Sequence, residues 1–213
     1  MSHKYFLLSL IWCITMGCIR GYNPQTGDLV FQDIDCGDLC TAIEKVTTGV
    51  NGTNLSHVGI VSLEHDTTFI YEAIGPGVKR TPIETFLKRS FDKKGNPKVL
   101  VGRLKPTYRI YIPEAINVCK SLMYKPYDDG FDLQNERYYC SELVYFAFND
   151  TSGIRLFNLN YMTFKDPDTR KTFPAWEDYF KKLKLPIPEG KPGLNPGSIS
   201  RSPVIDIVYR YYP

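Results

Sequence analysis

The stretch HVGIVSLEHDTTFIYEA, residues 57–73, decides the architecture of this chain. Two runs rich in β-branched and aromatic residues flank a polar turn at residues 64–67, a pattern typical of a β-hairpin. With the turn centred near residue 65, residue 57 faces residue 73 or 74. His57 and Glu72 are therefore within a residue or two of being cross-strand neighbours, and their side chains can meet if both face the same side.

The periodicity of apolar residues around this hairpin alternates between that of strands and that of helices, which predicts one mixed domain of the α+β class. Strands are expected at residues 28–32, 57–63, 68–73, 78–82, 98–104 and 204–211. Helices are expected at residues 39–48, 83–88, 113–123, 139–149 and 174–184. Residues 186–203 hold five prolines and three glycines and are expected to form a long loop.

The composition is that of an ordinary globular protein. Of 213 residues, 43% are hydrophobic and 23% are charged, with 26 basic and 23 acidic side chains and a net charge of +3. This excludes a chain that is disordered throughout. A small net charge without a long basic run argues against a nucleic-acid partner.

The first residues are typical of an export signal. Lys4 supplies a positive start, residues 5–16 are almost wholly apolar, and the small residues Gly17-Cys18 follow. A membrane anchor is the alternative, but it needs about 20 apolar residues, and Arg20 interrupts the run. We therefore expect a signal peptide at 1–21, a single domain at 22–213, and a location in the periplasm or cell envelope.

Cys18 could carry a lipid, because bacterial lipoproteins are modified on a cysteine directly after the cleavage point. Gly17 fits that pattern, whereas Thr15 and Met16 match it poorly. The sequence leaves lipidation, and with it a membrane tether, open.

Histidine is scarce in this chain, which narrows the choice of a general base. Once a leader containing His3 is removed, only His57 and His65 remain, and His65 falls in the polar turn. His57 begins an apolar strand and is either a core histidine or a base at a strand end. Glu72 is the only charge on its strand, and a carboxylate there is costly unless it is paired. A His57 partner would fix the imidazole tautomer and favour imidazolium.

Cys140 lies at the start of the apolar helix expected at 139–149. Unpaired backbone N–H groups and the positive end of the helix dipole lower the pKa of a thiol there, and the same N–H groups can bind an oxyanion. A buried structural cysteine is the alternative. Ser141 is a rival nucleophile, although we expect it to help cap the helix.

The remaining cysteines and acids suggest no metal or other cofactor. Cys36 and Cys40 form either a disulfide or two small apolar contacts, and too few ligands lie nearby for zinc. Cys119 is expected in the core. The segment YDDGFD, residues 127–132, lacks the spacing and the closing glutamate of a calcium loop.

Taken together in order and spacing, several motifs resemble the YiiX/YebB-like permuted papain-like amidases of the NlpC-type cysteine peptidase superfamily. The resemblance spans about residues 25–208 and rests on Gly27-Asp28-Leu29-Val30-Phe31, Ser56-His57-Val58-Gly59-Ile60-Val61, Tyr71-Glu72-Ala73, Lys125-Pro126-Tyr127-Asp128 with Phe131-Asp132, and Tyr139-Cys140-Ser141-Glu142-Leu143-Val144, with a proline-rich tail after residue 185.

The resemblance implies a circularly permuted papain-like fold, in which a central antiparallel sheet precedes a helix that begins with the nucleophile. It implies Cys140 as nucleophile, His57 as base and Glu72 as the orienting third residue. The Cys140 backbone N–H would bind the oxyanion, and Tyr139 and Ser141 are its candidate neighbours.

The expected function is that of an exported thiol hydrolase that cleaves an amide bond in a cell-wall peptide, small peptide or N-acyl substrate through a thioester acyl-enzyme. A lipid acyltransferase or thioesterase of the lecithin retinol acyltransferase-like kind is the first alternative, and a wide apolar groove would favour it. A non-catalytic binding module, in which Cys140 is unreactive, is the second.

Overall fold

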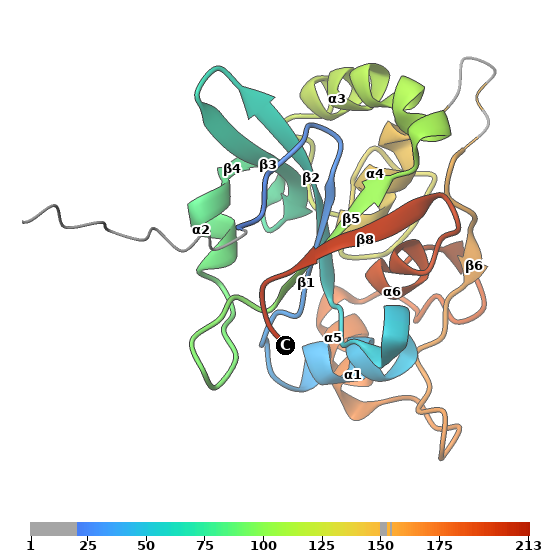
Figure 1. Cartoon of the computed structure of the whole chain (residues 1–213). Coiled ribbons are helices and arrows are strands. Elements are labelled where there is room, and N and C mark those ends of the chain that lie inside the picture. The colour runs from blue at the N-terminus through green and yellow to red at the C-terminus, as the bar shows by residue number, and fades with distance from the viewer. Residues whose placement is uncertain (1–20, 150–152, 154) are drawn as a thin grey trace, which may run out of the picture.

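A computed structural model of the chain describes residues 21–149, 153 and 155–213. Its centre is an antiparallel six-stranded sheet of order β4-β3-β2-β1-β5-β8 (Figure 1). The strands are β1 (Leu29–Gln32), β2 (His57–Glu64), β3 (Thr67–Ile74), β4 (Gly77–Pro82), β5 (Val99–Leu104) and β8 (Ile205–Arg210). The α+β fold expected from the sequence is confirmed. Apart from Gly21, the predicted signal segment with Cys18 lies outside the described residues.

The helices cover the two faces of the sheet unequally. They are α1 (Asp38–Val46), α2 (Ile83–Leu87), α3 (Ile112–Ser121), α4 (Cys140–Ala147), α5 (Pro174–Leu183) and α6 (Pro196–Ser200), with 3-10 turns at Val50–Gly52 and Pro106–Tyr111. Helices α3, α4 and α6 pack with one face of the sheet in the largest apolar core, and α2 packs on the other face. Among the helices of the described segments, none has the length and apolar character needed to span a bilayer.

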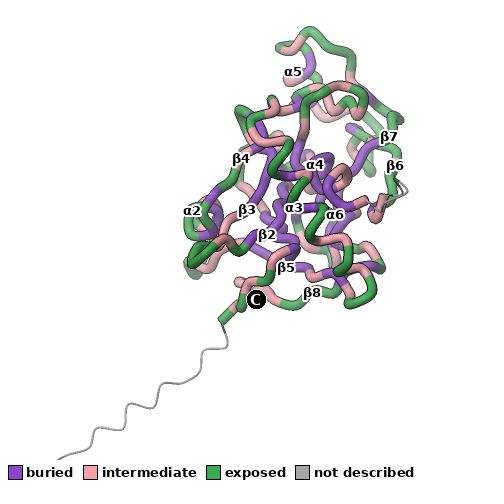
Figure 2. Tube along the Cα trace, turned by 90° about the horizontal axis from the view of Figure 1, so that it is seen from above, coloured by how far each residue is buried: buried purple, intermediate pink, exposed green. Residues whose placement is uncertain are grey.

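Helix α4 lies at the buried centre of the molecule, whereas α5 lies at its edge (Figure 2). Leu143, Val144 and Ala147 of α4 have no exposed surface. Helices α1 and α5 pack around a separate aromatic cluster centred on Phe164, Trp176 and Phe180. This outer layer stands beside the sheet and α4, and the candidate site lies where the two meet.

The β2–β3 hairpin has the register that the sequence predicts. Ile60 pairs with Tyr71, and continuing the register places Gly59 opposite Glu72 and His57 two residues further along on the same face. A Cβ at Gly59 would lie 2.4 Å from Cγ2 of Ile70 and 3.4 Å from Cβ of Glu72. Glycine at 59 therefore lets β3 lie close to β2 and leaves room for Glu72 to reach His57.

The prediction of a featureless loop at 186–203 is wrong. This segment contains β7 (Pro192–Gly193), paired with β6 (Asn160–Tyr161), and the short helix α6. Asn195 caps α6 by accepting a hydrogen bond from the Ser198 N–H at 2.7 Å. Proline at the first helical position is preorganised for a helix, so Asn195-Pro196 is a helix start that the overall proline and glycine content concealed.

Candidate functional site

Cys140 is the first residue of α4, as the sequence predicts, and its side chain is buried. The helix start is ordered by Glu142, whose Oε2 accepts a hydrogen bond from the Tyr139 N–H at 3.2 Å. The expectation that Ser141 caps the helix is therefore wrong. Ser141 is instead fully buried beside the thiol, with its Oγ 3.8 Å from the Cys140 Sγ.

His57 and Glu72 meet across the hairpin. The Nε2 atom of His57 lies 2.7 Å from Oε2 of Glu72, and Glu72 has no exposed surface. His57 and Cys140 are close enough for each to shift the pKa of the other. Because Nε2 is directed to the carboxylate, the other ring nitrogen, Nδ1, is the one left for the thiol. The structure thus brings Cys140, His57 and Glu72, which are far apart in sequence, into one row, with a hydrogen bond between His57 and Glu72.

The electrostatics of this row favour a thiolate–imidazolium pair. Burial by itself lowers the pKa of His57, but the hydrogen bonds and charges of Cys140 and Glu72 outweigh it and raise that pKa to about 9. Burial by itself raises the pKa of Cys140, but the neighbouring His57 above all, with Ser141 and the Val58 backbone, outweighs burial and holds that pKa below the ordinary value. Neighbouring opposite charges stabilise each other strongly in a site with little water.

Two further side chains hold Glu72, and neither was predicted from the sequence. Thr81 Oγ1 on β4 donates to Oε1 at 2.5 Å, and Arg89, just after α2, donates from Nη1 to Oε2 at 2.6 Å and from Nη2 to Oε1. Burial would raise the pKa of Glu72, but Arg89 and His57 hold it far below its usual range. The only signal in the sequence was that a charged Glu72 in an apolar strand is costly without a partner. This signal does not identify Thr81 or Arg89 as the partners.

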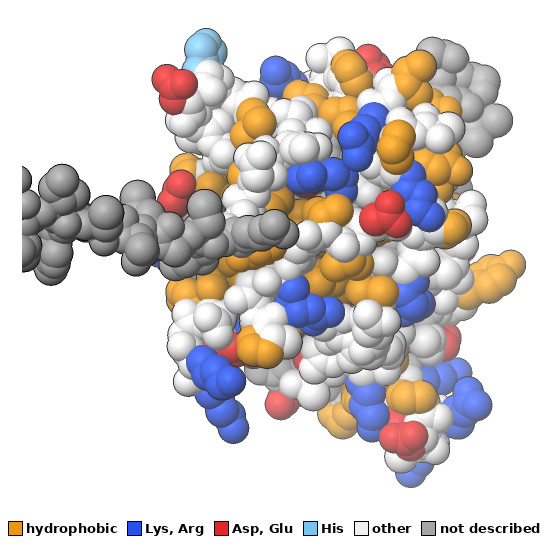
Figure 3. Space-filling view, viewed as in Figure 1, with side chains coloured by type: hydrophobic (Ala, Val, Ile, Leu, Met, Phe, Trp, Pro, Cys, Tyr) orange, Lys and Arg blue, Asp and Glu red, His pale blue; other side chains and the backbone are white. Residues whose placement is uncertain are grey.

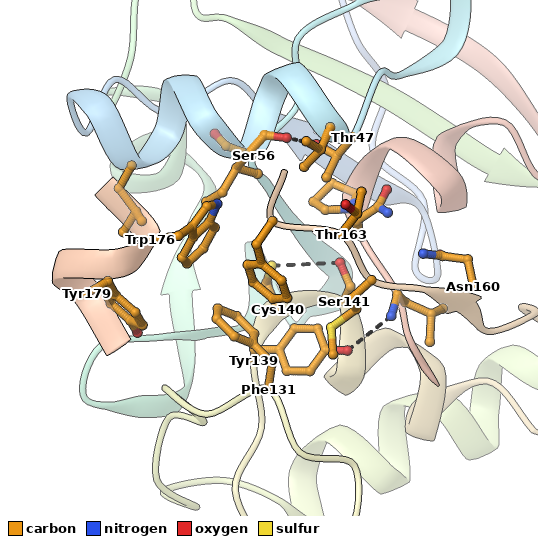
Figure 4. A pocket seen from close by; sticks show the side chains of 18 of the residues that line it. Thr47, Ser56, Phe131, Tyr139, Cys140, Ser141, Asn160, Thr163, Trp176 and Tyr179 are labelled. Atoms are coloured by element: carbon orange, nitrogen blue, oxygen red, sulfur yellow. Dashed lines mark hydrogen bonds between the residues drawn. The ribbon is translucent and has the colours of Figure 1, made fainter. Parts of the chain in front are cut away.

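The donors available to an oxyanion differ from those expected. The backbone N–H of Cys140 is in the first turn of α4, where it has no intrahelical acceptor. The Tyr139 N–H is taken by Glu142, and the Tyr139 hydroxyl turns away from Cys140 to accept a hydrogen bond from the Leu194 N–H at 3.1 Å (Figure 4). The expectation that Tyr139 contributes an oxyanion donor is therefore not supported by the geometry.

Tyr127 is a second tyrosine at this cavity. It lines the same cavity as Cys140, and burial followed by the charge of Cys140 raises its pKa well above the ordinary value. Its backbone is fixed by a hydrogen bond from its N–H to the Pro76 carbonyl at 2.9 Å. A phenol that keeps its proton can donate to an oxyanion that comes within its reach. In the sequence, Tyr127 stood out only as part of the motif Lys125-Pro126-Tyr127-Asp128, and the motif indicated no role for it.

A cavity of about 240 Å³ opens beside Cys140. Side chains from α1, α4, α5 and the segment around β6 surround it, with Cys140 and Ser141 at its inner end and Trp176 and Tyr179 to one side (Figure 4). Among the residues that the structure describes, no Asp, Glu, Lys or Arg lines it. The lining residues are Leu39, Ile43, Val46, Thr47, Ser56, Tyr127, Phe131, Tyr139, Cys140, Ser141, Asn160, Tyr161, Met162, Thr163, Phe164, Trp176, Tyr179, Leu194, Asn195 and Pro196. The cavity is therefore suited to an apolar group.

A disulfide and a set of aromatic contacts hold the outer wall of this cavity in place. A disulfide joins Cys36 to Cys40 at the start of α1, which resolves the alternative left open by the sequence and encloses Leu39, a lining residue. On the other side, the ring of Phe131 lies 5.2 Å from Tyr139 and 5.8 Å from Trp176, measured between centroids. Its loop is held by Asp128, which accepts hydrogen bonds from backbone N–H groups at 130 and 132.

The other residues considered in the sequence lie outside this site. Cys119 is fully buried, and burial raises the pKa of its thiol to about 12. His65 lies in the hairpin turn with a positive φ of 53°. In the part of the chain that the structure describes, no group of three or more His, Cys, Asp or Glu side chains is arranged to hold a metal ion. Asp128 instead binds donors of its own loop.

The sequence comparison with known families agrees with this geometry. Residues 23–209 match the family described as "Permuted papain-like amidase enzyme, YaeF/YiiX, C92 family". The chain belongs to this family. The match covers the sheet, α4 and the outer layer together, so the YaeF/YiiX amidase family accounts for the whole of the described domain.

Two relatives extend the comparison. The "Uncharacterized protein YiiX" of Escherichia coli (strain K12) is 29% identical over 157 residues, which are 73% of this chain and 71% of that protein. The crystal structure of metalloprotein yiiX from Escherichia coli O157:H7 superposes with a TM-score of 0.72 at 24% identity, covering 90% of this chain and all of that one. Although that relative is named a metalloprotein, the donor sets in the described residues of this chain do not fit a metal ion.

Proposed function

We propose that this protein is an exported thiol hydrolase that cleaves the amide bond of an N-acyl or small peptide substrate with an apolar acyl side. Cys140 is the nucleophile, His57 the general base and acid, and Glu72 the residue that orients His57. The observation that carries the proposal is the row of three buried side chains formed by Cys140 at the start of α4, His57, and Glu72, which is hydrogen-bonded to His57 at 2.7 Å. Membership of an amidase family supports it.

The reaction follows from these positions. The Cys140 thiolate attacks the carbonyl carbon and forms an S–C bond, while the Cys140 N–H and the Tyr127 hydroxyl stabilise the oxyanion. The tetrahedral intermediate collapses, the C–N bond breaks, and His57 gives its proton to the departing amine. His57 then takes a proton from water as the water attacks the thioester. The acid leaves, and the S–C bond breaks to restore the thiolate–imidazolium pair.

The cavity supports an apolar acyl side. Its lining contains aromatic and aliphatic side chains and no charge, and burying apolar surface contributes about 25 cal/mol per Å². A peptide with a charged side chain on the acyl side would lose its hydration there without gaining a partner. This favours N-acyl substrates over cell-wall peptides among the substrates expected from the sequence.

Export remains part of the proposal and has one structural support. Disulfides persist in oxidising compartments and are rare in the cytosol, and Cys36–Cys40 is a disulfide. The segment 1–21 would direct export, and a lipid on Cys18 would tether the domain to the membrane.

On the face shown in Figure 3, basic and acidic side chains are interspersed with apolar ones and form no continuous basic surface.

The experiment that tests the function compares the wild type with Cys140→Ala on a panel of N-acyl amino acids of increasing chain length and cell-wall peptides. Hydrolysis of the longer N-acyl substrates should be lost in Cys140→Ala and retained in Cys119→Ser, the matched change at the other free cysteine of the described chain. Hydrolysis that survives in Cys140→Ala would contradict the proposal.

The acyl cavity is tested separately with Ile43→Asp, which places a carboxylate among apolar lining residues. We expect KM for long N-acyl substrates to rise about tenfold or more, since a buried unpaired charge costs at least about 1–3 kcal/mol. Thr41→Asp, an exposed position on the same helix, is the control. An unchanged KM in Ile43→Asp would place the acyl group elsewhere.

A lipid acyltransferase is the second candidate, and the same apolar cavity favours it. The two reactions share the thioester and differ only in what attacks it: water in a hydrolase, an amine or alcohol in an acyltransferase. Mass analysis of products in the presence of a lipid amine or alcohol separates them. Predominant transfer of the acyl group would replace the hydrolase with the acyltransferase.

A further inference from the structure

We propose that Arg89 is a positioning residue that keeps Glu72 ionised and fixed toward His57, and so sets the pH above which Cys140 is a thiolate. The inference rests on the proposed function, because it assumes that the Cys140–His57 pair is the reactive one. It adds a fourth member to the row, from a part of the chain that neither the motifs nor the cavity includes.

First, every hydrogen-bond acceptor position of the Glu72 carboxylate is occupied. A carboxylate offers about four lone-pair positions on its two oxygens. Here Oε2 binds His57 and Nη1 of Arg89, and Oε1 binds Thr81 and Nη2 of Arg89. Arg89 thus grips both oxygens in the parallel two-point geometry that is specific to a guanidinium. This grip fixes the carboxylate plane and leaves one position of Oε2 aimed at His57.

The second observation is that Arg89 is itself held in place. Its guanidinium lies 5.1 Å from the ring centroid of Phe86, and the centroid of the His57 ring lies 6.0 Å from the same centroid. The Phe86 carbonyl accepts a hydrogen bond at 2.9 Å from the side-chain amide of Gln32 on β1. The sheet therefore anchors α2, and Phe86 is a common neighbour of Arg89 and His57.

The third observation concerns charge. Glu72 has no exposed surface, and burial favours its protonated form more than any other influence. Arg89 is the first of the groups that oppose this effect. A Glu72 that took up a proton could no longer stabilise the imidazolium, and His57 would then give up its proton before Cys140 did. The thiolate would form only at higher pH.

The test separates the charge of Arg89 from its fork-shaped geometry. Arg89→Met removes the positive charge and the paired hydrogen bonds to the two oxygens of Glu72. Arg89→Lys keeps the charge but loses the paired hydrogen bonds. Alkylation of Cys140 by iodoacetamide is followed by intact mass from about pH 4 to about pH 10, with amide hydrolysis measured in parallel. Arg80→Met is the matched control, because Arg80 pairs with Glu64 on the outer part of the same sheet.

In Arg89→Met we expect the midpoint of thiolate formation to move up by about one pH unit or more. In Arg89→Lys the midpoint should stay near that of the wild type while kcat falls about tenfold, with KM unchanged, since Arg89 does not line the cavity. Arg80→Met should match the wild type throughout. If Arg89→Met does not fold, Arg89→Lys still decides the question through kcat.

An unmoved or lowered midpoint in folded Arg89→Met, or an unchanged kcat in Arg89→Lys, would overturn the role of Arg89. These outcomes are distinct from failure of the proposed function. If no amide substrate is hydrolysed, the alkylation profiles still report whether Arg89 controls the Cys140–His57 pair. If Cys140→Ala retains hydrolysis, the function fails whatever the profiles show.

Discussion

Replacing Glu72 with glutamine tests how much of the reactivity of Cys140 depends on a residue that the thiol does not touch. The change keeps the shape of the side chain and removes its negative charge. The pKa of His57 is raised from 6.5 to about 9, which corresponds to about 3 kcal/mol of preference for imidazolium at about 1.4 kcal/mol per unit. Cys140 and Glu72 both contribute to this preference, and losing the charge of Glu72 removes the part that Glu72 supplies.

A loss of about 1.4 kcal/mol out of that total is a tenfold change in the ratio of ion pair to neutral pair. The midpoint of thiolate formation should therefore rise by about one pH unit, and alkylation on the acid side of the midpoint should slow about tenfold. The assay is the pseudo-first-order rate of iodoacetamide labelling from about pH 4 to about pH 10, read by intact mass. Cys119 adds no background, because burial raises its pKa to about 12.

Glu64→Gln is the matched control, because Glu64 is a carboxylate on the same hairpin that pairs with Arg80 away from the site. Thermal unfolding of each variant shows whether the fold is retained. If folded Glu72→Gln is labelled at the wild-type rate across the whole range, the coupling of Glu72 to Cys140 through His57 is refuted.

Three further predictions concern the scaffold. Gly59→Ala should lower the free energy of unfolding by about 1–3 kcal/mol, because a Cβ there would lie 2.4 Å from Ile70, whereas Gly130→Ala, with contacts no closer than 3.4 Å, should change it little; equal losses in urea unfolding would contradict this. Replacing Cys36 and Cys40 with serine opens a short loop and should cost about 2 kcal/mol and raise KM for N-acyl substrates, because Leu39 inside the loop lines the cavity; an unchanged KM would separate the disulfide from the site. Burial raises the pKa of Glu142 from 4.5 to about 8, so the wild type should lose stability as pH rises from about 4.5 through about 8, and Glu142→Gln should lose less; parallel curves for the two proteins would remove Glu142 as the source.

The parts of the site that the sequence predicted are those governed by local rules. The hairpin register follows from strand periodicity and turn length, so the approach of His57 to Glu72 is predictable from the sequence alone. Cys140 at the start of α4 follows from the apolar helix pattern after a polar segment. Each of these predictions uses only a short, continuous stretch of chain.

The parts that the sequence missed depend on contacts between distant segments. Arg89 looks like one of several basic residues around residue 90, and only the packing of α2 against the sheet turns it toward Glu72. The Tyr139 hydroxyl is drawn away from Cys140 by the Leu194 N–H, 55 residues later. Helix α6 was not predicted because proline and glycine in its sequence indicate a loop. Gly197 is needed for a tertiary contact, because a Cβ there would lie 1.8 Å from the Thr47 carbonyl oxygen.

The central claim is that Cys140 forms a thioester with the acyl part of an amide substrate. Mixing the wild type with a long-chain N-acyl amino acid that carries a good amine leaving group, quenching in acid and measuring intact mass tests it directly. We predict one added acyl group per chain, mapped by peptide digestion to Cys140, with one equivalent of amine released and no adduct in Cys140→Ala. An acyl group found on another residue such as Ser141, or amine released at the wild-type rate by Cys140→Ala, would contradict the account.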